Sequence, residues 1–312
     1  MIDWQPSVDV ETARKRAELL SQLRQFFAER HVLEVDTPLL AEAPVTDPYL
    51  QAFLVQQSNS LHYLQTSPEY AMKRMLAAGF GSIYQICKAF RQDESGALHH
   101  PEFTLLEWYR VGFDHHDLML EIDQLLQQIL GTPTADQMSY QQCFESMFAI
   151  NPHQVALSTL IDLTQKTLGN IIGLDSLQYD DCLQLLFSDK IEPTLGQDRP
   201  VFVYDYPVSQ AALAKTYQIN DTQVAARFEL FYQGIELANG YYELTNATEQ
   251  KRRFQRDLHI RQQQRIGSVP IDQRLLAAIE AGLPDCAGVA LGFDRLLMQY
   301  CHKSDIAAVI MK

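Results

Sequence analysis

The feature that most constrains this chain is a strand–loop–strand pattern in residues 83–110. The apolar run at residues 83–90 predicts a short buried strand, and residues 103–109 alternate as a second strand does. Because side chains alternate between the two faces of a strand, four side chains of the second segment share one face. These four are Phe103, Leu105, Glu107 and Tyr109.

An aromatic ring, a carboxylate and a phenol on one strand face form an unusual core, and Arg91 follows the preceding strand. The set would suit a nucleotide beside a small cationic substrate. Phe103 would contact the base, Arg91 a phosphate and Glu107 an amine. An ordinary hairpin with a solvated loop has the same periodicity, so the pattern alone leaves both interpretations open.

Composition narrows the classes of protein. With 312 residues, 46% of them hydrophobic, the chain has material for one large domain or one and a half. The formal net charge of −14 argues against a broad surface for a nucleic-acid backbone. Five cysteines without zinc-like spacing predict reduced thiols. No apolar stretch is long enough for a bilayer and none resembles a signal peptide, which predicts a cytoplasmic protein.

Elements before and after this pattern are also predicted. Residues 10–30 have helical periodicity, and residues 32–40 alternate as a strand that closes on Pro38. Ser67, Pro68 and Glu69 suit the cap and first turn of another helix. Further predicted elements are a helix at 117–130, a helical insertion at 139–196 and a buried strand at 201–207.

Residues 227–244 predict a long strand region interrupted by Gly234 and Gly240. Glu236 and Glu243 are seven residues apart and would face opposite sides of an unbroken strand. A bend or bulge at Gly240 could bring both carboxylates to one side, where they could hold Mg²⁺ against the phosphates of ATP. Two solvated carboxylates at a sheet edge would explain the same residues. A helix capped by Asn246, with Glu249 as capping-box partner, should follow.

A strand punctuated by glycines enters a helix at residues 285–298. Small residues let a nucleotide approach the backbone. Arg295, at the start of this helix, could lie across an aromatic base opposite Phe103.

Four of these stretches resemble segments of class II aminoacyl-tRNA synthetases, in the chain order motif 1, motif 2, GIELANG and motif 3. The helix and strand ending at Pro38 resemble motif 1, FRQD…HHPEFT…E at residues 90–107 resembles motif 2, and residues 288–295 resemble motif 3. GIELANG resembles the segment of the lysyl branch that carries metal-binding and substrate-binding acids. The resemblance covers about residues 10–298. It implies an α+β catalytic core with a mixed, mostly antiparallel sheet flanked by helices, in one domain over residues 1–312 with the insertion at 139–196.

Within the lysyl branch, the chain resembles the elongation factor P lysine ligase family throughout, including SPEY and PDCAGVALGFDR. Lysyl-tRNA synthetases carry an OB-fold domain that grips the anticodon; none is expected here, which makes tRNA a poor candidate acceptor. The resemblance implies an ATP-dependent ligase that activates (R)-β-lysine or lysine as an adenylate. The acceptor would be the ε-amine of a lysine of elongation factor P, a post-translational modification that supports translation. It also implies a homodimer formed through the motif 1 region.

The resemblance assigns roles to individual residues. Catalysis is expected from Arg91, Glu236 and Arg295, and Mg²⁺ binding from Glu236 and Glu243. ATP would contact Arg91, Gln92, Asp93, His100, Phe103, Glu236, Leu237, Gly292 and Arg295. The amino acid would contact Ser67, Pro68, Glu69, Glu107, Tyr109, Asn239, Glu243 and Ala290. Glu69 would hold the amino group near the carboxylate, and Glu107 with Tyr109 the side-chain amine.

The chain departs from the family pattern at a few of these positions. Gln92 and Asp93 replace Asn-Glu, and His100 replaces Asn, so the nucleotide geometry is expected to shift slightly. Ala290 replaces a glycine of the lysyl-tRNA synthetases. Its methyl group fits the shifted amine of β-lysine better than α-lysine, although one methyl discriminates only about tenfold to a few hundredfold.

Other functions share these motifs. One alternative is a truncated lysyl-tRNA synthetase-like enzyme that aminoacylates tRNA, and another acceptor would be a small amine, as in ammonia-dependent asparagine synthesis. Glu107 and Tyr109 favour a basic side chain over the latter. A non-catalytic synthetase-like binding subunit is the third alternative, and the presence of both Arg91 and Arg295 argues against it.

Overall fold

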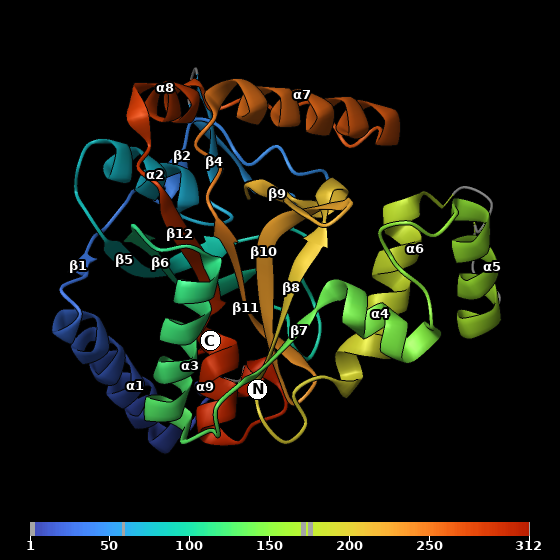
Figure 1. Cartoon of the computed structure of the whole chain (residues 1–312). Helices are drawn as coiled ribbons and strands as arrows, with labels where there is room; N and C mark the ends of the chain where they lie inside the picture. Colours follow the sequence, from blue (N-terminus) through green and yellow to red (C-terminus); the bar gives the residue numbers. More distant parts are fainter. Residues whose placement is uncertain (1–3, 58–59, 170–172, 174–176, 312) are drawn as a thin grey trace. The chain divides into compact units, whose positions relative to one another are not determined.

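The computed structural model describes residues 4–57, 60–169, 173 and 177–311. Figure 1 labels the helices and strands along the chain. The chain divides into two compact units. The first comprises Met1–Asp114 and Glu243–Lys312, and the second is His115–Tyr242. The prediction of one catalytic domain over residues 1–312 stays a prediction. In the described part of the chain, no helix has both the length and the apolar character needed to cross a membrane.

The first unit is built on a sheet with the strand order β1-β5-β6-β12. β1 and β5 are parallel, whereas β6 runs antiparallel to both β5 and β12. A smaller antiparallel sheet has the order β2-β4-β3. The strands are β1 (Leu33–Glu34), β2 (Leu40–Ala41), β3 (Leu54–Gln57), β4 (Ser60–Leu64), β5 (Ile83–Phe90), β6 (Glu102–Val111) and β12 (Cys286–Gly292). The helices are α1 (Val10–Glu29), α2 (Glu69–Ala77), α7 (Ala247–Gln264), α8 (Gln273–Gly282), α9 (Phe293–Cys301) and a 3₁₀ turn, η5 (Ile306–Ala308).

Helix α1 covers the larger sheet of this unit. Asp9 caps it by accepting the Thr12 N–H at 2.7 Å. Its buried Phe27 stacks on Tyr84 of β5, with ring centroids 4.3 Å apart, and meets Trp108 of β6 at 5.4 Å. The helix predicted at residues 10–30 is confirmed.

The strand predicted at residues 32–40 forms only at its two ends, as β1 and β2. Pro38 lacks the N–H that a continuous ladder needs, so pairing stops between the two short strands. In contrast, the strands predicted at 83–90 and 103–109 form as β5 and the centre of β6.

The second unit has a sheet of order β11-β10-β8-β7, with β9 also paired to β10. Its strands are β7 (Asp136–Ser139), β8 (Val201–Pro207), β9 (Thr216–Ile219), β10 (Thr222–Tyr232) and β11 (Ile235–Tyr242). Its helices are α3 (His115–Leu130), α4 (Tyr140–Phe148), α5 (Leu157–Leu168), α6 (Tyr179–Leu186), η2 (Phe187–Ile191), η3 (Glu192–Thr194) and η4 (Val208–Gln210). The predicted insertion at 139–196 contains α4 to η3, and Tyr140 stacks there on Phe187 with centroids 5.2 Å apart.

The long strand predicted at 227–244 is a hairpin, so the bend expected at Gly240 was wrong. Gln233 and Gly234 both have positive φ, 52° and 71°, and form the tight turn between β10 and β11. Gly240 lies inside β11, and the irregularity in the pairing falls at Leu230 and Phe231 of β10 instead.

The capping box predicted at the start of α7 forms only in half. Asn246 accepts the Glu249 N–H at 2.9 Å, as expected. The Glu249 carboxylate, however, pairs with the Arg252 and Arg253 side chains. Two guanidinium groups attract this carboxylate more strongly than a backbone N–H does, and they lower its pKa to about 2.

Asp294 joins the end of β12 to the start of β6. The Asp294 carboxylate is buried at the start of α9 and accepts the Thr104 backbone N–H at 2.6 Å. Thr104 lies just beyond the last residue of β6 that pairs with β12, Leu105. The carboxylate therefore replaces the carbonyl that a longer β12 would have offered, and it fixes the β6 segment that carries Phe103.

Replacing Asp294 is expected to destabilise the protein through this bond. Asp294→Ala leaves the Thr104 N–H buried without an acceptor and should lower the free energy of unfolding by about 1–3 kcal/mol. Asp294→Asn keeps an acceptor oxygen and should lose less than half as much. Urea unfolding of both variants tests this, and equal losses would contradict the assignment.

Candidate active site

Three glutamates of the first unit gather around one lysine. Lys73 of α2 is 1% exposed, and its Nζ lies 2.5 Å from Glu69 Oε1 and 2.6 Å from Glu243 Oε2. Glu107 and Tyr109 of β6 complete the group, which we call the carboxylate pocket. The sequence predicted Glu69, Glu107, Tyr109 and Glu243 as amino-acid ligands, and the structure brings these four together.

Different elements deliver these side chains. Glu69 is the first residue of α2, and Lys73 follows one helical turn later on the same face. Glu107 lies in the middle of β6. Glu243 comes into place because its N–H donates to the Cys286 carbonyl at 3.0 Å, which holds this segment beside the start of β12.

The Glu107 carboxylate has a fixed orientation. Tyr109 donates its hydroxyl to Oε1 at 2.7 Å, and Ser67 donates its hydroxyl to Oε2 at 2.7 Å. Ser67 also accepts the Glu69 N–H at 3.1 Å, so it links two acids of the pocket. Ser67 was predicted as the helix cap, but the helix begins one residue later, after Pro68, and the Ser67 hydroxyl donates into the pocket.

Burial and repulsion between the carboxylates raise the pKa values of two glutamates in the pocket. Burial and the charge of Glu69 raise the pKa of Glu107 to about 7. Burial also raises the pKa of Glu243, to about 8, despite the opposing charge of Lys73. For Lys73, burial disfavours the charged form, but the charges of Glu243 and Glu69 outweigh it and raise the pKa above its ordinary value. The lysine is therefore charged throughout the physiological range.

Strand β12 forms a floor of small residues under the pocket. In the antiparallel register Ala290 lies opposite Glu107, and Gly288 lies opposite Tyr109. A Cβ at Gly288 would lie 2.3 Å from Tyr109 Cε1 and 2.5 Å from Glu243 Oε1. Only glycine leaves these two side chains where they are.

The predicted nucleotide residues of the first unit lie at the ends of β5, β6 and β12. The Arg91 guanidinium lies over the Phe103 ring, 4.9 Å from its centroid, and 3.7 Å from the Glu94 carboxylate. Arg295 donates to the Leu98 carbonyl at 3.2 Å and its Nη2 lies 2.9 Å from His99 Nε2. Both arginines thus contact residues of the motif 2 loop. A bound nucleotide could take the place of these loop residues as their partner.

The remaining residues of this predicted set are in or beside the same loop. Gln92 donates its side-chain amide to the Ala52 carbonyl at 2.8 Å. Asp93 has a positive φ of 60°, and the His100 ring contacts the Glu102 backbone. Gly292 stands at the N-cap of α9.

Glu236, Leu237 and Asn239 are residues of β11 in the second unit. Asn239 donates to Glu229 Oε1 of β10 at 3.3 Å, and its own Oδ1 is buried without a hydrogen-bond partner in the described part of the chain. Burial raises the pKa of Glu229 against the charge of Arg227, and the charge of Glu236 adds to the rise. Glu229 and Glu236 therefore form a pair of acids on neighbouring strands.

Sequence reasoning missed Lys73 and Glu229. The Glu69–Lys73 spacing signals an (i, i+4) ion pair, which is most often a surface feature. Glu229 lies two residues after Arg227 on one strand face, and the hairpin turn at Gly234 would have placed it beside β11.

Among the described residues no cluster of three or more His, Cys, Asp or Glu side chains could hold a metal by itself. A magnesium ion needs fewer protein ligands, because it keeps waters and binds substrate phosphates alongside one or two carboxylates. The Glu229–Glu236 pair fits that requirement.

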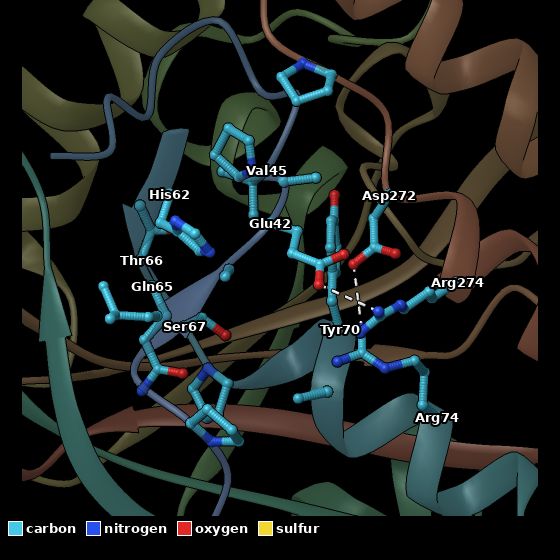
Figure 2. A pocket seen from close by; sticks show the side chains of 18 of the residues that line it. Glu42, Val45, His62, Gln65, Thr66, Ser67, Tyr70, Arg74, Asp272 and Arg274 are labelled. Atoms are coloured by element: carbon cyan, nitrogen blue, oxygen red, sulfur yellow. Dashed lines mark hydrogen bonds and ion pairs between the residues drawn. The ribbon is translucent and has the colours of Figure 1, made fainter. Parts of the chain in front are cut away.

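A cavity of about 630 Å³ opens beside the pocket, also within the first unit. Figure 2 shows its lining, which includes Thr66 and Ser67 from the segment before α2. Arg74 pairs with Asp272 across it at 3.1 Å. The pocket acids are absent from the lining, so Ser67 is the side chain that the two share.

Comparison with known proteins identifies the family. The model of the family "tRNA synthetases class II (D, K and N)" matches residues 1–311. The chain therefore belongs to the class II tRNA synthetase family, of the branch that includes the D, K and N enzymes. The predicted mixed, mostly antiparallel α+β core of that class is confirmed.

Curated relatives narrow the family further. The elongation factor P–(R)-β-lysine ligase of Vibrio atlanticus (strain LGP32) is 49% identical over 98% of this chain and 97% of the relative. That of Vibrio vulnificus (strain YJ016) is 51% identical over 95% of this chain and 93% of the relative. That of Edwardsiella ictaluri (strain 93-146) is 46% identical over 99% and 97%. The resemblance predicted from the motifs is confirmed.

Gly288→Ala is expected to disrupt the pocket. The added methyl group must displace the Tyr109 ring and the Glu243 carboxylate, which should cost about 1–3 kcal/mol of stability. Thermal unfolding measures this loss. Gly292→Ala is the steric control, because the three atoms nearest to its Cβ would be Arg295 side-chain atoms at 3.5 Å or more. Equal stability of the two variants would contradict the close packing at Gly288.

Proposed function

We propose that this chain is an ATP-dependent ligase that activates (R)-β-lysine, or lysine, and transfers it to elongation factor P. The observation that carries the amino-acid part is the carboxylate pocket. The buried Glu107 and Glu243 and the half-buried Glu69 gather around one lysine, so the pocket has room for the charge of a substrate with two ammonium groups. The names of the relatives support β-lysine as that substrate and elongation factor P as the acceptor.

The first step joins the substrate carboxylate to the α-phosphorus of ATP and releases pyrophosphate. A carboxylate is already a nucleophile at neutral pH, so this step needs positioning and charge stabilisation rather than a general base. Arg91 would exchange Glu94 for the α-phosphate, a second anion of suitable size. Arg295 would exchange His99 for the adenine ring, with Phe103 on the other face.

The amino acid would lie along β6. Glu107 and Glu243 would bind the side-chain ammonium, with Tyr109 holding Glu107 in place. Glu69 would bind the ammonium group nearer the carboxylate. Ala290, opposite Glu107, would narrow the pocket where β-lysine and α-lysine differ.

Mg²⁺ would neutralise phosphate charge and orient the leaving pyrophosphate. The resemblance assigns it to Glu236 and Glu243, but Glu243 lies in the carboxylate pocket of the first unit, with Glu69, Glu107 and Lys73. Glu229, on the neighbouring strand of the second unit, is within reach of the charge of Glu236 and is itself in an ion pair with Arg227. We therefore expect Glu236 and Glu229 to bind the ion and Glu243 to bind the amino acid.

In the second step, the ε-amine of an acceptor lysine attacks the acyl-adenylate. An amide bond forms, AMP leaves, and the amine loses a proton.

The motif 1 region would supply a homodimer contact, and Leu33 on the edge strand β1 is 51% exposed there.

An acceptor assay tests the whole proposal. Purified protein, Mg-ATP and labelled β-lysine or lysine are offered elongation factor P and bulk tRNA in parallel. We expect label on the factor, with more from β-lysine. Label on tRNA instead would support the alternative of a truncated tRNA synthetase, and label on neither would contradict both acceptors.

Two variants test the nucleotide assignments. Arg91→Ala removes the expected α-phosphate contact, and Glu236→Gln removes a metal carboxylate. Each should lower the rate of amino-acid-dependent ATP–pyrophosphate exchange by at least about a hundredfold, the usual effect of losing one charge-stabilising group. Arg199→Ala, which removes an exposed arginine paired with Asp136, is the matched control. Near-wild-type exchange in both variants would overturn the site assignment.

A further inference from the structure

Lys73 is the one member of the carboxylate pocket without a role in the proposed reaction. It is 1% exposed, and both of its ion-pair partners, Glu69 and Glu243, are acids that should bind substrate. Burying a lysine so deeply is strongly unfavourable unless nearby carboxylates compensate its charge. Filling space in the core is therefore a poor explanation for a lysine at this position.

The charges that face one another come from three segments. Helix α2 contributes Glu69 and Lys73, β6 contributes Glu107 and the neutral Tyr109, and Glu243 follows β11. Cys87 of β5 is also near Glu107, but burial and that charge raise the pKa of its thiol to about 12, so it stays neutral. With all acids ionised, three negative charges would face one positive charge.

We propose that Lys73 is a positioning and specificity-determining residue. Its ammonium group orients Glu69 and Glu243 and neutralises one of the three carboxylates of the pocket. Two negative charges remain uncompensated, which we call the charge deficit of two. This inference rests on the proposed function. Protons fill the deficit in the free protein, and the two ammonium groups of a diamino acid fill it in the complex. Binding of the substrate thus exchanges protons for ammonium groups.

Because substrate ammonium groups replace protons on the carboxylates, the affinity for the amino acid should increase with pH. The raised pKa values of Glu107 and Glu243 mean that both carboxyls carry protons in the free protein on the acid side of neutrality. A protonated carboxyl cannot form an ion pair with an ammonium group. Affinity for the diamino acid should therefore rise with pH through the range of about 7 to 8, whereas affinity for ATP should not follow this curve.

The wild-type protein offers a test that needs no variant. Lysine is titrated into the protein at pH 7 by calorimetry, in two buffers with different ionisation enthalpies. We expect the heats to differ and to report release of at least about half a proton per lysine bound. Equal heats in the two buffers, with binding observed, would overturn the proton exchange.

Lys73→Met tests the role of the lysine itself, since it keeps the length of the side chain and removes the charge. We expect the KM for lysine or β-lysine to rise at least tenfold and the KM for ATP to change less than threefold. The acid limb of kcat/KM for the amino acid should move to higher pH, because the acids lose their nearest cation. Lys15→Met is the matched control, since Lys15 forms the same (i, i+4) pair with Glu11 on the surface of α1.

A double variant separates charge from packing. Lys73→Met/Glu69→Gln restores the deficit of two, so its acid limb should return toward the wild-type pH even though its KM stays high. A purely structural role for Lys73 predicts additive losses and no return of the acid limb. That result, or an unchanged KM and acid limb in Lys73→Met, would overturn the inference.

These outcomes are distinct from failure of the proposed function. If the wild-type protein activates no diamino acid, the proposed function fails. If it activates one and Lys73→Met behaves as Lys15→Met does, only the role of Lys73 fails. Should Lys73→Met not fold, as a melting curve would reveal, the proton count on the wild-type protein decides.

Discussion

The register between β6 and β12 is the constraint on which the chemistry of the first unit depends. It sets Glu107 opposite Ala290 and Tyr109 opposite Gly288. The two polar side chains of β6 therefore lie next to the two smallest residue types on β12. A shift by one residue would turn Glu107 and Tyr109 to the other face of the sheet. Asp294, which accepts the Thr104 N–H, holds the register at the end where β12 becomes α9.

Within that frame, electrostatics accounts for the composition of the pocket. Buried carboxylates are unfavourable unless cations or hydrogen-bond donors compensate them. Tyr109 and Ser67 supply donors to Glu107, and Lys73 supplies a cation to the other two acids. One lysine does not neutralise all three carboxylates of the pocket, so two negative charges remain for a substrate to neutralise. We infer that the two uncompensated negative charges favour a substrate with two ammonium groups.

Much of this could be predicted from sequence, because the relevant signals are local. Period-two alternation located β6 and its active face, and the spacing of small residues located β12 before α9. Partners across elements were harder. The Glu69–Lys73 spacing is the same whether the pair is buried or exposed, and only the tertiary fold brings Glu243 to it. The hairpin at Gly234 was missed because Gln233 has a positive φ that its residue type does not signal.

We infer that two ammonium groups on one substrate neutralise the two uncompensated carboxylates of the pocket. Amino-acid-dependent ATP–pyrophosphate exchange with lysine and with norleucine tests it most directly, since norleucine has nearly the same shape and lacks the side-chain ammonium. We expect exchange with lysine or β-lysine and a kcat/KM at least about a thousandfold lower with norleucine, because the acids would be left unpaired. Comparable exchange with norleucine would contradict it.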